Sequence, residues 1–313
     1  MDNHHGQDFR RVISELTASH LPGKNKPLRL ALIALLSGGH ILIEDIPGLG
    51  KTTLALALSR SLGLSFGRVQ CTSDLLPSDI TGLTIFDRHD NNFRFVKGPA
   101  FNNILLVDEI NRAMPKTQSA LLEAMEEHRI TADGTTYDLP EPFLVIATQN
   151  PAEQAGTYPL PESQMDRFVI RTGMGYPDEE IEKGIIRYGS IHDDLRSIKM
   201  LLDQTAIIAA IKEVATSVYL SEKLADYIYR IVAATRNDRD IITGISTRGA
   251  ISIAQAAKAN AFMEGRDHVL PEDIKEVAVA VGAHRLLLRS GSDSADKESL
   301  LNGLLSAIPI PLS

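Results

Sequence analysis

Residues suited to binding phosphate follow a short apolar run near the start of the chain. The run 41–43 leads into Pro47-Gly48-Leu49-Gly50-Lys51-Thr52-Thr53 and then into the helix-forming stretch 54–62. Glycines let backbone N–H groups surround an oxyanion, and the helix that follows directs the positive end of its dipole at the same place. Lys51 can contact β- and γ-phosphates, and the Thr52 hydroxyl can ligate Mg²⁺. The order of strand, glycine loop, Lys-Thr and helix therefore predicts a phosphate-binding loop.

One position departs from the usual pattern of such loops. A glycine normally stands five residues before the second loop glycine, and this chain has Asp45 there. On these residues alone, a strand–turn–helix with a chance Gly-Lys-Thr stays open as an alternative.

Two acids and an amide end two further apolar runs. Asp108 and Glu109 follow the run 103–107, and Asn150 follows the run 143–148. Asp108 can hold the shell of a Mg²⁺ ion, and Glu109 can orient and polarise a water that attacks a γ-phosphate. Asn150 can help to position the same water. The alternatives are acids that leave a strand for solvent and an Asn that caps a turn before Pro151.

Size and composition narrow the class of protein. The chain has 313 residues, 43% of them hydrophobic and 23% charged, which predicts a globular protein of two domains. A net charge of −8 argues against a dedicated nucleic-acid binder, although a local basic patch stays open. The single cysteine, Cys71, excludes an internal disulfide and a cysteine zinc site, and we expect a small buried hydrophobe there. We see no export signal or bilayer-length apolar run and expect a cytoplasmic protein without a membrane span.

Apolar runs and helical periodicity place these residues on an α/β core. Strands are expected near 41–44, 66–71, 103–109, 143–148 and 168–171. Two antiparallel hairpins, at 84–96 and 130–139, interrupt the alternation of strands and helices. Pro115 begins the helix that follows the third of these strands, at a position where the missing N–H costs nothing.

Tyr176-Pro177 marks a break, because the residue before a proline is pushed out of helix. The chain after this break reads as helical. Helices are predicted at 178–189, 203–215, 221–235, 247–264 and 271–285, with no strands and with a loop at 290–296. We therefore expect an α/β nucleotide-binding core with its N-terminal helix at 1–177, followed at 178–313 by a linker helix and a small all-α domain.

Several motifs together resemble the MoxR-type AAA+ ATPases, a helix-2-insert clade related to the ATPase subunits of magnesium chelatase. The resemblance covers about residues 22–285, and its motifs stand in the order of that family. The motifs are Ile43-Glu44-Asp45-Ile46-Pro47-Gly48-Leu49-Gly50-Lys51-Thr52, Leu106-Val107-Asp108-Glu109-Ile110-Asn111-Arg112-Ala113, Gln118-Ser119-Ala120-Leu121-Leu122-Glu123-Ala124-Met125-Glu126-Glu127, Ala147-Thr148-Gln149-Asn150-Pro151 and Leu160-Pro161-Glu162-Ser163-Gln164-Met165-Asp166-Arg167-Phe168. The start of the phosphate loop varies in that family, so Asp45 is compatible with it.

The resemblance implies roles for individual residues. Lys51 and Thr52 match the Walker A pair, Asp108 and Glu109 the Walker B pair, and Asn150 the sensor-1 residue. Arg167 matches the arginine finger, which reaches the nucleotide of the next subunit, and Arg248 matches the sensor-2 arginine. The alternatives are a salt bridge of Arg167 with Asp166 or another acid, and a surface arginine at 248. Whether Arg248 acts on its own nucleotide or on a neighbour's stays open.

The resemblance also implies a fold and a kind of work. We expect an αβα sandwich with a five-stranded, mainly parallel sheet, followed by a lid. ATP and Mg²⁺ are the expected cofactors, and the expected assembly is a ring, hexameric in that family. Such a ring would remodel, mature or insert metal into a partner protein, often one with a von Willebrand A domain. A non-hydrolysing scaffold and a DNA-directed motor are the alternative functions. The presence of Glu109 disfavours the scaffold, and the net negative charge of the chain disfavours the DNA-directed motor.

Two further features concern ligand contacts. The hairpin tips 88–92 and 133–135 are expected to touch the partner, with ordinary surface hairpins as the alternative. Residues 22–26 (Pro22-Gly23-Lys24-Asn25-Lys26) depart from the family pattern near the adenine, so the base preference stays open.

Overall fold

The computed structural model describes residues 4–89, 91–151, 156–188, 195–289 and 294–311 of the chain. Its centre is a sheet of five strands in which every neighbouring pair runs parallel. The order across the sheet is β2 (Phe66–Gln70), β5 (Ile104–Asp108), β8 (Leu144–Gln149), β1 (Ile41–Glu44) and β9 (Ile170–Thr172). The predicted five-stranded sheet is confirmed, and it is parallel throughout. The strand before Asn150 lies, as expected, between the strands that end at Glu44 and Asp108.

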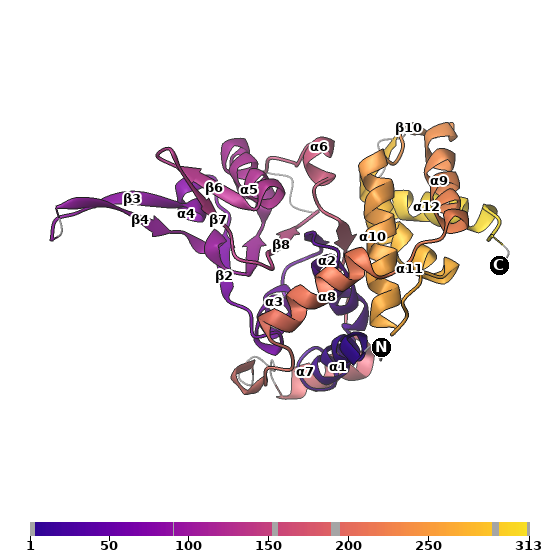
Figure 1. Ribbon diagram of the computed structural model, residues 1–313, viewed down its shortest axis with the longest axis horizontal. Helices are drawn as coiled ribbons and strands as arrows, with labels where there is room; N and C mark the ends of the chain where they lie inside the picture. The colour runs from indigo at the N-terminus through magenta and orange to yellow at the C-terminus, as the bar shows by residue number, and fades with distance from the viewer. Residues whose placement is uncertain (1–3, 90, 152–155, 189–194, 290–293, 312–313) are drawn as a thin grey trace.

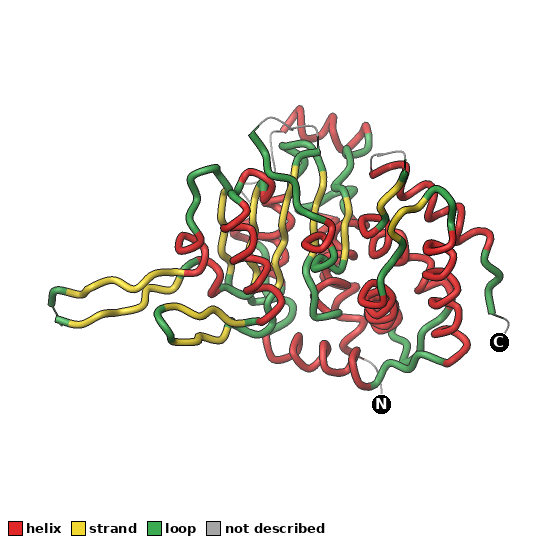
Figure 2. Tube along the Cα trace, turned by 90° about the horizontal axis from the view of Figure 1, so that it is seen from above, coloured by secondary structure: helices red, strands yellow, loops and turns green. Residues whose placement is uncertain are grey.

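The sheet separates two apolar clusters, because successive side chains of a strand point to opposite faces. Ile41 and Ile43 face one cluster, and Leu42 faces the other. The first cluster includes α1 (His4–Ser19), α2 (Asn25–Leu36), α3 (Lys51–Ser61) and much of the C-terminal half. The second includes α4 (Pro77–Thr81) and α5 (Pro115–Glu127). Helices thus cover both faces of the sheet (Figure 2), which explains why its central strands are apolar along their length.

Both predicted hairpins are present and lie outside the main sheet. The first pairs β3 (Gly82–Asp87) with β4 (Asn92–Lys97), and the second pairs β6 (Arg129–Ala132) with β7 (Thr135–Asp138). The first projects from one end of the molecule (Figure 1). Residue 90, part of its expected contact tip, lies outside the described residues. The hairpins touch through Phe95 and Tyr137, whose rings stack with centroids 4.3 Å apart.

The helices predicted for the C-terminal half are confirmed. They are α7 (Glu179–Tyr188), α8 (Gln204–Thr216), α9 (Glu222–Asn237), α10 (Thr247–Met263) and α11 (Pro271–Gly282). Among the described residues, no helix is both long and apolar enough to cross a bilayer. The short elements include α6 (Glu162–Met165) and 3₁₀ turns at Pro99–Phe101, Ile110–Arg112 and Ala283–Arg285.

Two features of the C-terminal half differ from the prediction. The strands β10 (Ile241–Thr243) and β11 (Leu287–Leu288) pair antiparallel, so this half is not wholly helical. Strands this short carry no readable alternation. A further helix, α12 (Ser294–Ala307), occupies part of the expected loop 290–296, of which residues 290–293 lie outside the described part. It buries Leu301 and Leu305, one turn apart, against the larger cluster.

Cys71 follows β2 and is buried, as expected for a small hydrophobic side chain. Burial raises the pKa of its thiol to about 12, so the sulfur stays protonated and unreactive at neutral pH.

Candidate functional site

The predicted phosphate loop connects β1 to α3 at the carboxyl edge of the sheet. Gly48 and Gly50 have φ of 88° and 90°, a left-handed conformation in which a side chain would be strained. The first turn of α3 borders a cavity of about 250 Å³. The lining residues come from the loop and from the neighbouring strand ends: Pro47, Gly48, Gly50, Lys51, Thr52, Thr53, Arg68, Gln70, Asp108, Glu109, Thr148 and Asn150. The structure therefore brings the predicted phosphate loop, the acid pair and Asn150 together, except that Leu49 of the loop faces an adjoining cavity.

Lys51, the first residue of α3, lines this cavity. Its Nζ donates a hydrogen bond to the backbone carbonyl of Asp45. Burial lowers the pKa of the amine, although the charges of Asp45, Asp108 and Glu109 oppose that shift. A partly desolvated cation in front of a helix N-terminus is a strong binding group for a phosphate anion.

The unusual Asp45 has a structural role. Its Oδ2 accepts hydrogen bonds from the N–H groups of Met174 and Gly175, both at 2.9 Å. Its Oδ1 accepts from the N–H of Ile46. The carboxylate thus ties the start of the phosphate loop to the segment that follows β9, a contact that glycine could not make.

The acid pair lies across the cavity from the loop. Asp108 Oδ2 accepts from Arg68 Nε at 2.8 Å, and Asp108 Oδ1 accepts from the Thr148 hydroxyl at 3.3 Å. Glu109 Oε2 accepts from Gln70 Nε2 at 3.0 Å and from Arg112 at 3.2 Å. Both carboxylates are therefore held in place by side chains from neighbouring elements.

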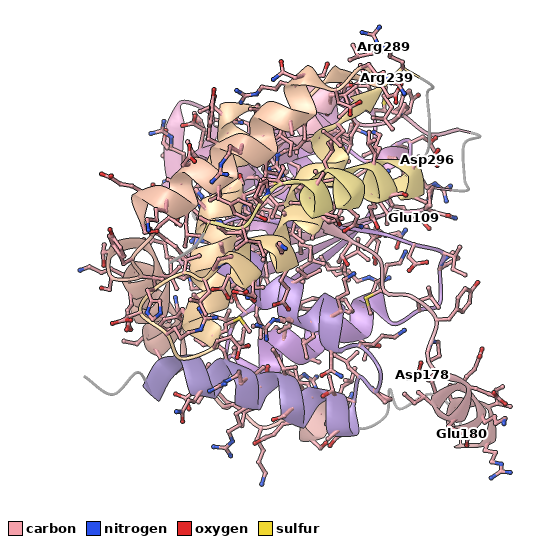
Figure 3. The ribbon with its side chains drawn as sticks, turned by 90° about the vertical axis from the view of Figure 1, so that its right-hand side faces the viewer. Glu109, Asp178, Glu180, Arg239, Arg289 and Asp296 are labelled. Carbon is pink, nitrogen blue, oxygen red and sulfur yellow. The ribbon has the colours of Figure 1, made fainter. Side chains whose placement is uncertain are left out.

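Glu109 itself has a φ of 56°, which is uncommon outside glycine and occurs at functional sites. Figure 3 shows its side chain well apart from Asp178 and Glu180, which belong to the segment around the start of α7. The acids of that segment do not join the acid pair.

Sequence reasoning missed Arg68, Gln70, Arg112 and Thr148. A signal existed for the first two, because they stand two residues apart on β2 and so share a face. Two polar residues on one face of a strand in a parallel sheet indicate a ligand site or a buried ion pair.

The residues predicted to ligate Mg²⁺ fit that ion. Thr52 and Asp108 line the same cavity. One hydroxyl and one carboxylate, completed by substrate phosphates and water, form the set of ligands that Mg²⁺ uses in nucleotide sites. Among the described residues, no cluster of three or more His, Cys, Asp or Glu offers a metal site of another kind.

A second, smaller cavity of about 150 Å³ adjoins the first and shares Gly48, Gly50 and Thr53 with it. Its other walls are largely apolar: Leu21, Pro22, Leu49, Pro177 and Ile185, with His20 and Lys24. Lys24 Nζ donates to the carbonyls of Met174 and Gly175, and burial lowers the pKa of this amine. The segment 22–26, which departs from the family pattern, thus still contributes an apolar wall beside the phosphate loop.

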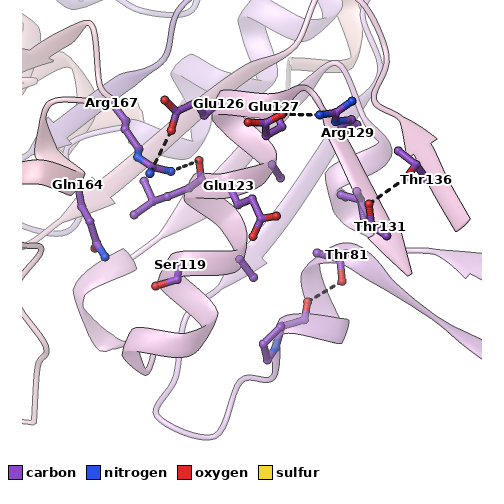
Figure 4. A pocket seen from close by; sticks show the side chains of 15 residues that line it. Thr81, Ser119, Glu123, Glu126, Glu127, Arg129, Thr131, Thr136, Gln164 and Arg167 are labelled. Atoms are coloured by element: carbon purple, nitrogen blue, oxygen red, sulfur yellow. Dashed lines mark hydrogen bonds and ion pairs between the residues drawn. The ribbon is translucent and has the colours of Figure 1, made fainter. Parts of the chain in front are cut away.

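The two predicted arginines do not lie at this site. Arg167 and Arg248 both contact Glu126, at 3.0 and 2.7 Å. Arg167 also lines a cavity of about 960 Å³ between α5, α6 and the second hairpin (Figure 4), which shares no lining residue with the phosphate cavity. The alternative ion pair of Arg167 with Asp166 is not present among the described residues; Asp166 pairs with Arg285 instead, at 2.6 Å. The other open alternative, a salt bridge of Arg167 with another acid, is formed, and Glu126 is that acid.

Comparisons with known proteins agree with this geometry. Residues 40–170 match the model of the ATPase family associated with various cellular activities (AAA), and residues 233–302 match the AAA lid domain. The uncharacterized protein YeaC of Bacillus subtilis is 41% identical, over 93% of this chain and 91% of its own length. Chaperone MoxR1 of Mycobacterium tuberculosis is 38% identical, over 92% of this chain and 79% of its own. The crystal structure of a candidate ATPase from Cytophaga hutchinsonii superposes with a TM-score of 0.89 at 40% identity and covers 99% of this chain and 96% of its own.

Proposed function

The chain belongs to the MoxR family of AAA ATPases, and on that premise we propose that it hydrolyses ATP to ADP and phosphate in order to remodel or mature a partner protein. One observation carries the proposal. The phosphate loop, the acid pair and Asn150 all line one cavity at the carboxyl edge of a parallel sheet.

We assign the chemistry to this chain's own side chains. Lys51 and the backbone N–H groups of 47–53 bind the phosphates, and the apolar cavity beside the loop takes the base. Glu109 accepts a proton from the attacking water. At the same time the water oxygen forms a bond to the γ-phosphorus, and the bond between the γ-phosphorus and the oxygen that leaves with ADP breaks. Thr52 and Asp108 would hold Mg²⁺, which when bound supplies positive charge beside the phosphate oxygens.

The held position of Glu109 supports hydrolysis over a purely structural use of the nucleotide. Gln70 and Arg112 both donate to its carboxylate, which orients a base that a scaffold would not need. We assign to Asn150, which directly follows β8 and lines the same cavity, the role of orienting that water.

We propose that the active assembly is a ring, hexameric as the resemblance implies, in which Arg167 and Arg248 serve the neighbouring subunit. Two observations support this proposal. Arg167 lines a cavity separate from the phosphate cavity, and Arg248 contacts the same carboxylate as Arg167, that of Glu126. An arginine supplied by a neighbour is typically worth about 10³–10⁵ in rate. We keep the division into a core at 1–177 and a lid region at 178–313 as part of this proposal.

The first hairpin is our candidate for partner contact. It exposes Phe86 and Phe93, at 49% and 70%, whose rings meet edge to face. Large apolar side chains on a projecting hairpin fit a partner protein better than a nucleic acid. Two finer expectations come from the resemblance: a partner with a von Willebrand A domain, and metal insertion as one form of maturation. A cytoplasmic location is the expectation from the sequence.

Steady-state ATPase activity per subunit, measured over a wide range of protein concentration with Glu109→Gln as the blank, tests the proposal. We expect activity that rises with concentration, because the site is completed between subunits. Activity equal to the blank at every concentration would overturn hydrolysis by this site. Activity above the blank that stays flat with concentration would overturn the shared site.

A further inference from the structure

Glu126 joins two arginines that come from different parts of the chain. Arg167 precedes β9 in the core, and Arg248 lies in the first turn of α10. One carboxylate oxygen contacts Arg248 at 2.7 Å, and the other contacts Arg167 at 3.0 Å. Two guanidinium groups that share one carboxylate lie close together, where their like charges would otherwise repel.

The position of Glu126 in its helix is unfavourable locally. It stands in the last turn of α5, beside Glu127, and that turn contains no basic residue. Acidic side chains near a helix C-terminus oppose the helix dipole, so helix stability does not explain this residue. The hydrogen bond from Arg248 and the charge of Arg167 instead hold the pKa of Glu126 below its usual value, which keeps it ionised.

The backbone on both sides of Arg167 is fixed separately. Arg285, from the 3₁₀ turn after α11, is buried and donates to the carbonyls of Asp166 and Phe168 at 3.1 and 3.0 Å. Its Nε also pairs with the Asp166 carboxylate. Because Arg285 fixes the backbone, the direction of the Arg167 side chain depends on its other contacts within the described part of the chain, which are Glu126 and the Leu122 carbonyl.

We propose that Glu126 is a positioning residue that holds Arg167 and Arg248 as one pair, so that both reach the same phosphate group of a neighbouring subunit. This inference rests on the proposed function. Without the carboxylate, the two cations separate and lose their common direction, and misplaced catalytic groups lose most of their effect on rate.

The test is Glu126→Gln, with Glu127→Gln as the matched control. Glu127 is the adjacent acid of the same helix and pairs with exposed Arg129 instead. We expect Glu126→Gln to lower kcat roughly tenfold or more with little change in KM, because the residue lies away from its own nucleotide cavity. The control should retain the activity of the unaltered chain. Equal kinetic constants for both variants would overturn the inference.

Mixing experiments separate positioning from a merely structural defect. Glu126→Gln subunits keep Glu109 but lack a well-placed arginine pair. Glu109→Gln subunits keep the arginine pair but lack the base. A mixture of the two should hydrolyse ATP several-fold faster than the mean of its parents. A mixture that only matches that mean would refute positioning in favour of a fold defect.

A parallel mixture of Arg167→Ala with Glu109→Gln distinguishes the inference from its premise. Recovery in this mixture, without recovery in the Glu126→Gln mixture, would overturn the role of Glu126 alone. Recovery in neither would show that Arg167 does not act between subunits, and it would overturn the shared site together with the inference that rests on it.

Discussion

The buried His40, one residue before β1, should make the fold sensitive to mild acid. Its Nδ1 accepts a hydrogen bond from the Val145 N–H, and its Nε2 donates to the Met125 carbonyl, both at 3.0 Å. This pattern requires the neutral ring. Protonation would place a second N–H against the Val145 donor and a charge in a site where the residue is only 3% exposed.

Burial lowers the pKa of His40 to about 4, against an ordinary value of 6.5. Because the folded-state pKa lies below the unfolded one, the unfolded chain binds the proton first as the pH falls. The stability that neutral His40 provides is therefore complete above about pH 6.5 and is lost between there and about pH 4. Over the part of this window from pH 7 to pH 5, the loss amounts to about 2 kcal/mol of unfolding free energy.

The assay compares urea unfolding of the unaltered chain and His40→Gln at a series of pH values. Glutamine can offer one acceptor and one donor but does not titrate, so the difference in unfolding free energy should shrink by about 2 kcal/mol between pH 7 and pH 5. His284 is also buried, and burial holds its pKa well below the ordinary value. It contributes to both chains alike and cancels in the difference. A difference that does not vary with pH, or a His40 ring that titrates near 6.5 by NMR, would refute this reasoning.

Two other predictions concern charged side chains that hold backbone or a buried partner. Asp45→Gly restores the usual loop residue but removes the acceptor for the N–H groups of 174–175, and it should lower the free energy of unfolding by about 2 kcal/mol in urea titrations. An unchanged stability would contradict the role given to Asp45. Arg266→Gln leaves the buried Asp273 without its charge partner and should cost about 3 kcal/mol. Arg11→Gln, which breaks an exposed pair, should cost less than about 1 kcal/mol, and equal losses would argue against burial as the cause.

The order of elements was readable from the sequence because it depends on local patterns. Apolar runs predicted the five strands of the sheet, and residues with 3.6-residue periodicity predicted the C-terminal helices. Turn-forming residues predicted both hairpins, and Asn91 and Asp133 do adopt positive φ there. The phosphate loop and the acid pair were also found this way, since each is a short stretch at a strand end.

Other features had no local pattern to reveal them. Each strand of the β10–β11 pair is too short to alternate, and α12 follows a polar stretch that resembles a loop. That helix brings Glu298 to the buried Arg171, which also pairs with Glu44 at the end of β1. No local sequence pattern around Glu44, Arg171 or Glu298 predicts that these three side chains pair with one another.

The sequence by itself therefore determined which residues could bind phosphate and activate water, because the phosphate loop and the acid pair are each a short stretch of particular residues at a strand end. Only the tertiary structure decided how those side chains are held: Glu109 by Gln70, Asp45 by the turn after β9, and the two arginines by Glu126. The physical reason is that a hydrogen bond or an ion pair acts over a few ångströms in space. Partners that lie tens or hundreds of residues apart meet at that range only when the sheet and the helices have packed.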